Sequence, residues 1–143
     1  MNKDKVYLTF FNLMILFPFI YLISFFILSS FDLTFTYHTL DISVKAQIIL
    51  ALLLIIWSYA NATEDSSIQM QTISKAGLCL AVLNIIIMLP LLAFSTSLKD
   101  SENYTKINGK QMISIDTDSS TSYTNYYDSK TIFLRSKNIK FTK

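Results

Sequence analysis

The chain has 143 residues, of which 52% are hydrophobic and only 15% are charged, and its mean hydropathy is +0.42. A soluble domain of this length cannot bury so much apolar surface, which excludes an ordinary soluble globular fold. The net charge of +2 comes from scattered basic residues and argues against a nucleic-acid partner. The composition predicts a protein whose surplus apolar surface lies in a lipid bilayer.

Charged residues avoid three long windows of the sequence. None occurs in 6–31, 46–63 or 76–98, windows of 26, 18 and 23 residues. A helix needs roughly 17 to 25 residues to cross the hydrocarbon core. We therefore predict an all-α integral membrane protein with three transmembrane helices, followed by a small polar β-rich tail. The predicted spans are about residues 6–30, 44–60 and 76–97.

The ends of the predicted spans carry their own signals. The first apolar run is too long for the hydrophobic region of a secretory signal, and no small-residue cleavage site follows it, so we expect an uncleaved span. In the second span, Lys45 can extend toward the membrane surface at one end, and Trp57 and Tyr59 mark the other interface. Aromatic and polar residues alternate in the link 31–43, which we expect at the headgroup level.

Beyond residue 97 the composition changes abruptly, because residues 98–143 hold 13 Ser or Thr, four Tyr and 13 charged residues. This predicts a transmembrane domain over 1–97 and an extramembrane tail over 98–143. The pair Asn108-Gly109 separates β-prone runs and favours a type I′ hairpin turn. A tail this short rarely builds its own core, so its strands should lean on the membrane loops or on a partner. Disorder of its last third is the alternative.

Asparagine and proline recur together in the first and third spans. Pro18 follows Asn12 and Pro90 follows Asn84, with five apolar residues in each interval. These two spans run in the same direction, so the two asparagines lie at similar depths. An amide in hydrocarbon needs partners, and we expect both side chains to turn inward and to bond to each other or to carbonyl groups of another helix.

Each proline also leaves a helix carbonyl without a donor, because proline has no N–H. Pro18 cannot bond to Met14, and Pro90 cannot bond to Ile86, so a kink is expected at each. Packing between the chain's own helices is the simpler interpretation of these residues. The alternative is a polar site that binds a ligand or a partner's helix. The candidate contact residues are Asn12, Pro18, Asn84 and Pro90.

The sequence lacks the motifs of catalysis and transport. No Asp, Glu, Lys, Arg or His lies well inside a span, which argues against ion transport. A glycine-rich phosphate loop, a serine elbow and a carboxylate pair beside a histidine are all missing, so we expect no enzyme and no nucleotide site. His38 is the only histidine and Cys79 the only cysteine, which leaves a metal or haem without a second ligand. No catalytic residue, metal or cofactor is predicted.

The orientation in the membrane depends on a nearly balanced distribution of lysines. We expect a cytoplasmic N-terminus and an exterior tail, in a plasma or inner membrane, because the first helix often sets the orientation. A cytoplasm-only reporter that is active after Lys143 would refute this orientation.

Two classes of function fit these features. The first is a small non-catalytic protein that binds and neutralises or regulates a membrane partner, as immunity proteins against pore-forming toxins do by helix packing in the bilayer. The second is a structural accessory subunit of a larger membrane complex that docks through its tail. Holin-like assembly into a lesion is disfavoured by the size and strand content of the tail. The expected partners are the lipid bilayer and either another membrane protein or further copies of the chain.

Overall fold

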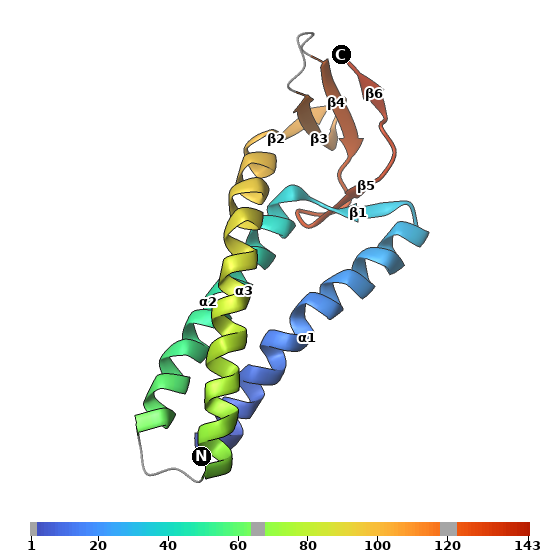
Figure 1. The fold of residues 1–143 in the computed structure, drawn as a ribbon. Helices are drawn as coiled ribbons and strands as arrows, with labels where there is room; N and C mark the ends of the chain where they lie inside the picture. The colour runs from blue at the N-terminus through green and yellow to red at the C-terminus, as the bar shows by residue number, and fades with distance from the viewer. Residues whose placement is uncertain (1–2, 64–67, 118–122) are drawn as a thin grey trace. The chain divides into compact units, whose positions relative to one another are not determined.

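Three long helices make up most of the first hundred residues. The computed structural model describes residues 3–63, 68–117 and 123–143. Three helices in these ranges are long and apolar enough to cross a membrane, as the charge-free windows predicted. The helices are α1 (Lys3–Ser30), α2 (Tyr37–Thr63) and α3 (Ile68–Asp100), drawn in Figure 1.

The helices are longer than the predicted spans, and α2 and α3 begin seven and eight residues before the predicted starts at 44 and 76. We expected residues 31–43 to form a link, whereas α2 already begins at Tyr37. The cause is a cap on the first turn, because the Thr36 hydroxyl accepts a hydrogen bond from the Thr39 N–H at 3.2 Å. Such a side-chain acceptor satisfies one of the N–H groups that a helix start leaves unpaired.

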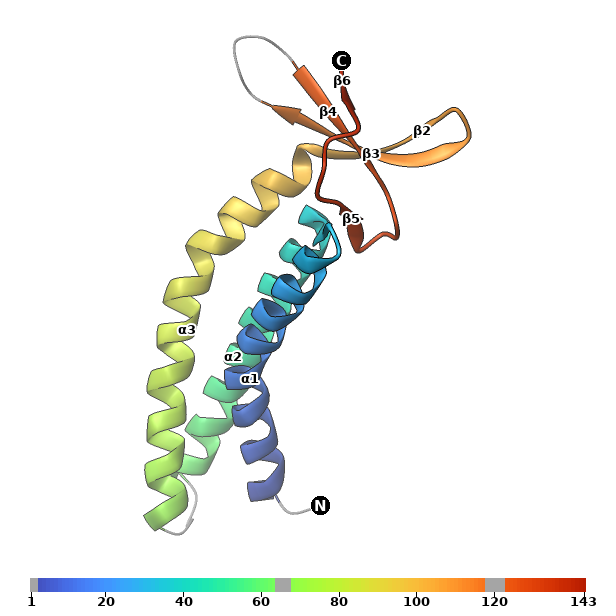
Figure 2. The ribbon, with the colours of Figure 1, turned by 90° about the vertical axis from the view of Figure 1, so that its right-hand side faces the viewer.

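The chain after α3 forms a small β region, as the composition of the tail predicted. Four strands make one antiparallel sheet in the order β2-β3-β4-β6, and these strands are labelled in both views (Figures 1 and 2). β5 pairs with β1, beside which it is drawn in Figure 1. The strands are β1 (Leu33–Phe35), β2 (Glu102–Ile107), β3 (Lys110–Thr117), β4 (Tyr123–Asp128), β5 (Leu134–Ser136) and β6 (Phe141–Thr142).

The predicted hairpin turn between β2 and β3 is confirmed. Asn108 and Gly109 have φ angles of 49° and 81°, the left-handed conformation that both central residues of a type I′ turn require. Ile107 pairs with Lys110 directly across the turn. The turn therefore fixes the register of β2 against β3.

The tail leans on the segment between α1 and α2, as its small size predicted. β1 from that segment pairs with β5, so that Leu33 lies opposite Ser136. The Thr36 hydroxyl, fully buried, also donates to the Ile132 carbonyl at 3.0 Å. The last third of the tail contains β5 and β6, which disfavours the alternative of disorder.

By its internal packing the chain divides into two compact units. The first consists of Met1–Tyr21 and Val44–Leu91, and the second of Leu22–Ser43 and Leu92–Lys143. All three helices contribute to both units. The boundary at residue 97 between a transmembrane domain and an extramembrane tail stays a prediction. α1 and α3 each continue through their proline, and the kinks stay a prediction.

Each unit has a small core of its own. In the first unit it lies where α1, α2 and α3 meet, and in the second it follows β3. Most other apolar side chains of the helices are exposed, with Ile56 of α2 at 68%. The buried apolar residues of the first unit are Tyr7, Met14, Val44, Ala51, Leu54 and Ala81, and those of the second are Met112, Ile113 and Ile115.

Candidate functional site

A buried hydrogen bond joins α1 to α2 in the first unit. The hydroxyl groups of Tyr7 and Ser58 lie 3.0 Å apart, and neither residue is more than 1% exposed. Gly77 of α3 lies against this pair, and a Cβ atom at this position would overlap the Tyr7 hydroxyl. The absence of a side chain at Gly77 therefore lets α3 approach α1 closely.

The carbonyl that Pro18 leaves free in α1 has a donor from α2. The Gln47 Nε2 donates to the Met14 carbonyl at 2.8 Å, and both residues are buried. Met14 lies four residues before Pro18, so this is the carbonyl that the proline cannot satisfy. The sequence predicted that this carbonyl needs a donor, but it did not identify Gln47 as the donor.

An open groove of about 200 Å³ lies between α1 and α3 in the first unit. Asn84 lines it, and its Oδ1 atom is buried without a hydrogen-bond partner among the residues that the structure describes. A buried acceptor left in this way costs about 1–3 kcal/mol. The other lining residues, all apolar, are Met14, Ile15, Pro18, Leu80, Leu83 and Ile87.

Asn12 differs from the expectation that both asparagines turn inward. Tyr7, Phe11 and Met14 recur at helical spacing and occupy the inner face of α1. Asn12, two residues before Met14, falls on the far side of the helix and is exposed. Within the described chain no hydrogen bond reaches the amide of Asn12, and Asn84 Oδ1 accepts none from it.

The remaining predicted contact and anchor residues lie on the three helices of the first unit. Trp57 is half-buried and packs beside Phe10, with ring centroids 6.0 Å apart. Tyr59, Lys45 and Pro90 are exposed. Their roles at a membrane interface or a partner contact stay predictions.

In the second unit, buried charges connect the β region to the start of α2. The Glu102 carboxylate accepts a hydrogen bond from the His38 N–H at 3.1 Å, where the helix dipole favours a negative charge. The Arg135 guanidinium carbon lies 4.2 Å from the centroid of the Tyr127 ring and 5.1 Å from that of Tyr37. Both contacts are cation–π in geometry and hold the buried cation between two strands and the helix.

A buried acid also joins α2 to α3 in this unit. Asp41 is 1% exposed and accepts a hydrogen bond from the Thr96 hydroxyl at 3.0 Å. The Lys99 ammonium lies 4.0 Å from its other oxygen. A buried carboxylate needs such partners to remain charged. We therefore interpret these contacts as structural, because they hold α2 against α3.

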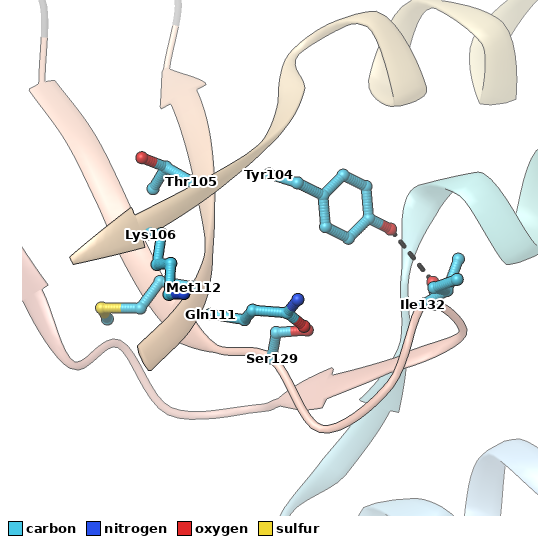
Figure 3. Close-up of a pocket in the computed structure, with 7 residues that line it drawn as sticks. All are labelled: Tyr104, Thr105, Lys106, Gln111, Met112, Ser129 and Ile132. Atoms are coloured by element: carbon cyan, nitrogen blue, oxygen red, sulfur yellow. Dashed lines mark hydrogen bonds between the residues drawn. The ribbon is translucent and has the colours of Figure 1, made fainter. Parts of the chain in front are cut away.

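A hollow of about 470 Å³ lies beside β2 in the second unit, and Figure 3 shows the side chains around it. The Tyr104 hydroxyl donates to the Ile132 carbonyl at 3.0 Å and closes one end. Burial, and after it the charge of Glu102, raises the pKa of Tyr104, so the phenol stays protonated and keeps donating. The hollow is lined by Tyr104, Thr105, Lys106, Gln111, Met112, Ser129 and Ile132.

Neither the groove between α1 and α3 nor the hollow beside β2 has the side chains that a metal or cofactor site needs. In the ranges 3–63, 68–117 and 123–143, no three His, Cys, Asp or Glu side chains come together in a way that could hold a metal ion. His38 is half-buried, and Cys79 is exposed. Catalysis and cofactor binding therefore gain no support from the described residues.

The uncharged polar residues that hold the first unit together were not predicted. Tyr7, Gln47 and Ser58 lie in the charge-free windows, and all three are buried and hydrogen-bonded. A signal was present, since Gln47 is an isolated amide in an apolar run, as Asn84 is. Only the spacing from a proline distinguished Asn12 and Asn84 from Gln47 in the sequence.

Comparison with models of known protein families, with curated proteins and with solved structures found no match to this chain.

Proposed function

We propose that this chain is an integral membrane protein with three bilayer-spanning helices, which binds another membrane protein within the bilayer and neutralises or regulates it without catalysis. The observation that carries the proposal is the groove between α1 and α3, where Asn84 Oδ1 has no donor among the described residues. Asn12 adds a second amide, exposed on the outer side of α1.

Insertion into a bilayer accounts for the exposure of apolar side chains. α1, α2 and α3 have the length and hydropathy of membrane spans, yet residues such as Phe26 and Ile56 are 67% and 68% exposed. In water this exposed area would drive aggregation, whereas in hydrocarbon it costs nothing. The backbone of each helix pairs within itself, as a bilayer requires.

The two amides are costly in hydrocarbon unless another molecule supplies partners. Asn12 would face lipid, and Asn84 would keep an unsatisfied oxygen at the edge of an apolar groove. A partner helix that packs in the groove can donate to Asn84, and a separate partner contact on the outer side of α1 can bond to Asn12. Each such bond contributes about 0.6 to 2 kcal/mol in a membrane, and the close packing in the groove adds dispersion energy.

The features of the helices favour an inhibitor or regulator over a transporter. Among the described residues, the buried polar groups of the first unit are neutral, and the buried Asp41 of the second unit is paired with the partly exposed Lys99 and with the Thr96 hydroxyl. An ion pathway normally exposes titratable groups to a water-filled route through the spans. We further propose a plasma or inner membrane location, with the tail on the exterior side, which the reporter after Lys143 tests.

Co-purification of the partner tests the role of the groove. The tagged chain is extracted from its native membranes in mild detergent, and co-purifying membrane proteins are quantified. Asn84→Leu should weaken retention of the partner by about threefold to thirtyfold, because one intramembrane hydrogen bond is lost. The variant's helix content and melting temperature serve as folding controls.

A relocated amide provides the matched control. Val82 is exposed on α3, two residues from Asn84 and on the other side of the helix. The double variant Asn84→Leu with Val82→Asn keeps the number of asparagines in α3 but removes the amide from the groove, so retention should stay low. Equal recovery of the partner by the original chain and by Asn84→Leu would contradict the proposal.

A further inference from the structure

β2 forms one edge of the four-stranded sheet, and its pairing pattern leaves alternate backbone groups without a strand to bond to. The two-residue turn makes Ile107 and Lys110 a hydrogen-bonded pair, and such pairs alternate with non-hydrogen-bonded ones along an antiparallel ladder. Residues 102, 104 and 106 fall at the non-hydrogen-bonded positions. Their N–H and C=O groups therefore point away from β3, toward the open edge.

Two observed hydrogen bonds agree with this alternation. The Asp116 N–H donates to the Ser101 carbonyl at 3.2 Å, so the backbone of residue 101 bonds toward β3, as expected for the odd-numbered residues of this strand. The Ser129 N–H donates to the Gln111 carbonyl at 3.3 Å, so Gln111 turns its backbone away from β2. The assignment of the outward-facing groups to Tyr104 and Lys106 follows from both.

The hollow beside β2 opens at this same edge. Tyr104, Thr105 and Lys106 of the edge strand all line it, and Gln111 lies opposite Lys106 on the same face of the sheet (Figure 3). Lys106 is exposed, and among the described residues no carboxylate pairs with it. Among the described residues, neither its ammonium nor the Gln111 side-chain amide has a hydrogen-bond or ion-pair partner, so both can donate to a ligand in the hollow.

We propose that the edge of β2 is a docking site for an extended, acidic segment of a partner protein. The segment adds as a fifth strand to the sheet and bonds to the outward-facing backbone groups of Tyr104 and Lys106. A side chain opposite Lys106 lies on the same face, so an Asp or Glu there enters the hollow and accepts from the Lys106 ammonium and the Gln111 amide. This site is independent of the groove between α1 and α3.

The charge at the edge selects this occupant. Lysine on an edge strand opposes pairing with neutral or basic strands, because it would bury an unpaired ammonium. An Asp or Glu on the added strand pairs with the ammonium and removes that cost. The main-chain hydrogen bonds supply affinity whatever the other side chains of the strand are.

A peptide selection on the full chain in lipid nanodiscs tests the proposal. Random ten-residue peptides are selected, and the binding of the enriched ones is measured by fluorescence anisotropy. Enriched peptides should share an Asp or Glu within a run of β-branched residues. Lys106→Glu should weaken their binding about tenfold or more, because a charge-assisted hydrogen bond becomes a repulsion.

Four variants separate this mode from general attraction to positive charge and from binding in the groove. Lys110 lies on the same hairpin but on the other face, so Lys110→Glu should leave affinity within about twofold of the original. Lys106→Pro should abolish binding, since it removes an outward N–H, whereas Lys106→Gln, which keeps that N–H, should retain part of it. Asn84→Leu should leave peptide binding unchanged.

Several results would overturn the proposal: no enriched peptide, enrichment without acidic residues, equal losses from Lys106→Glu and Lys110→Glu, or equal affinities of Lys106→Pro and Lys106→Gln.

Discussion

Gly77→Ala should destabilise the first unit, although alanine is the better helix former by about 1 kcal/mol. The added methyl group would overlap the Tyr7 hydroxyl, which is fully buried and bonded to Ser58. Overpacking of this kind costs about 1–3 kcal/mol, and breaking the hydrogen bond adds about 1 kcal/mol. Thermal unfolding in mild detergent, followed by circular dichroism, should show a lower melting temperature.

A second substitution identifies the clash as the cause. Tyr7→Phe removes the overlapping oxygen, so the double variant Tyr7→Phe with Gly77→Ala should melt at a higher temperature than Gly77→Ala alone. Tyr7→Phe by itself should lower the melting temperature, because Ser58 loses its partner. A Gly77→Ala variant that melts at or above the original temperature would show that α3 does not approach Tyr7 as described.

Gln47→Leu should destabilise the chain through the carbonyl that Pro18 frees. In the original chain the substitution leaves the Met14 carbonyl without its donor from α2. In a Pro18→Ala background, residue 18 regains an N–H that bonds to Met14 within the helix, so Gln47 matters less. A double-mutant cycle should give a coupling of about 0.6 to 2 kcal/mol between the two positions.

The cycle is informative because single variants at these positions have mixed effects. Gln47→Leu also removes Oε1, which is buried without a hydrogen-bond partner among the described residues, and this partly offsets the loss. Pro18→Ala changes helix propensity as well. The coupling cancels these separate contributions. Strict additivity of the two free-energy changes would contradict the contact between Gln47 and Met14.

Features that depend on neighbouring residues in the sequence were predicted well. The charge-free windows predicted three apolar helices because hydrocarbon length sets a minimum run of uncharged residues. Asn108-Gly109 predicted its hairpin because only left-handed backbone angles fit a type I′ turn. In both cases a local rule decides the structure.

Features that depend on distant residues were not predicted. α2 begins at Tyr37 because Thr36 caps it, and Thr36 is itself held by the Ile132 carbonyl, which lies far along the chain. Asn12 was expected inside, but Tyr7 and Met14 occupy the inner face of α1, and helical spacing then places Asn12 outside. Which face of a helix turns inward is decided by the other helices, and spacing from a proline does not reveal it.

The two proposed contacts use different physical principles and different parts of the fold. The groove between α1 and α3 offers a buried amide oxygen without a partner among the described residues, where one hydrogen bond contributes about 0.6 to 2 kcal/mol. The β2 edge offers main-chain groups beside a free ammonium, a pattern suited to an extended acidic segment.

Photo-crosslinking in intact membranes tests the central claim most directly. p-Benzoylphenylalanine is placed at Ile15, on the rim of the groove, or at Ile56, an exposed position on α2 outside it. Irradiation should link the Ile15 position to an integral membrane protein, and Asn84→Leu should reduce the yield of this crosslink. The Ile56 position should yield lipid adducts instead. Lipid adducts alone at Ile15, or the same protein captured equally from both positions, would contradict binding through the groove.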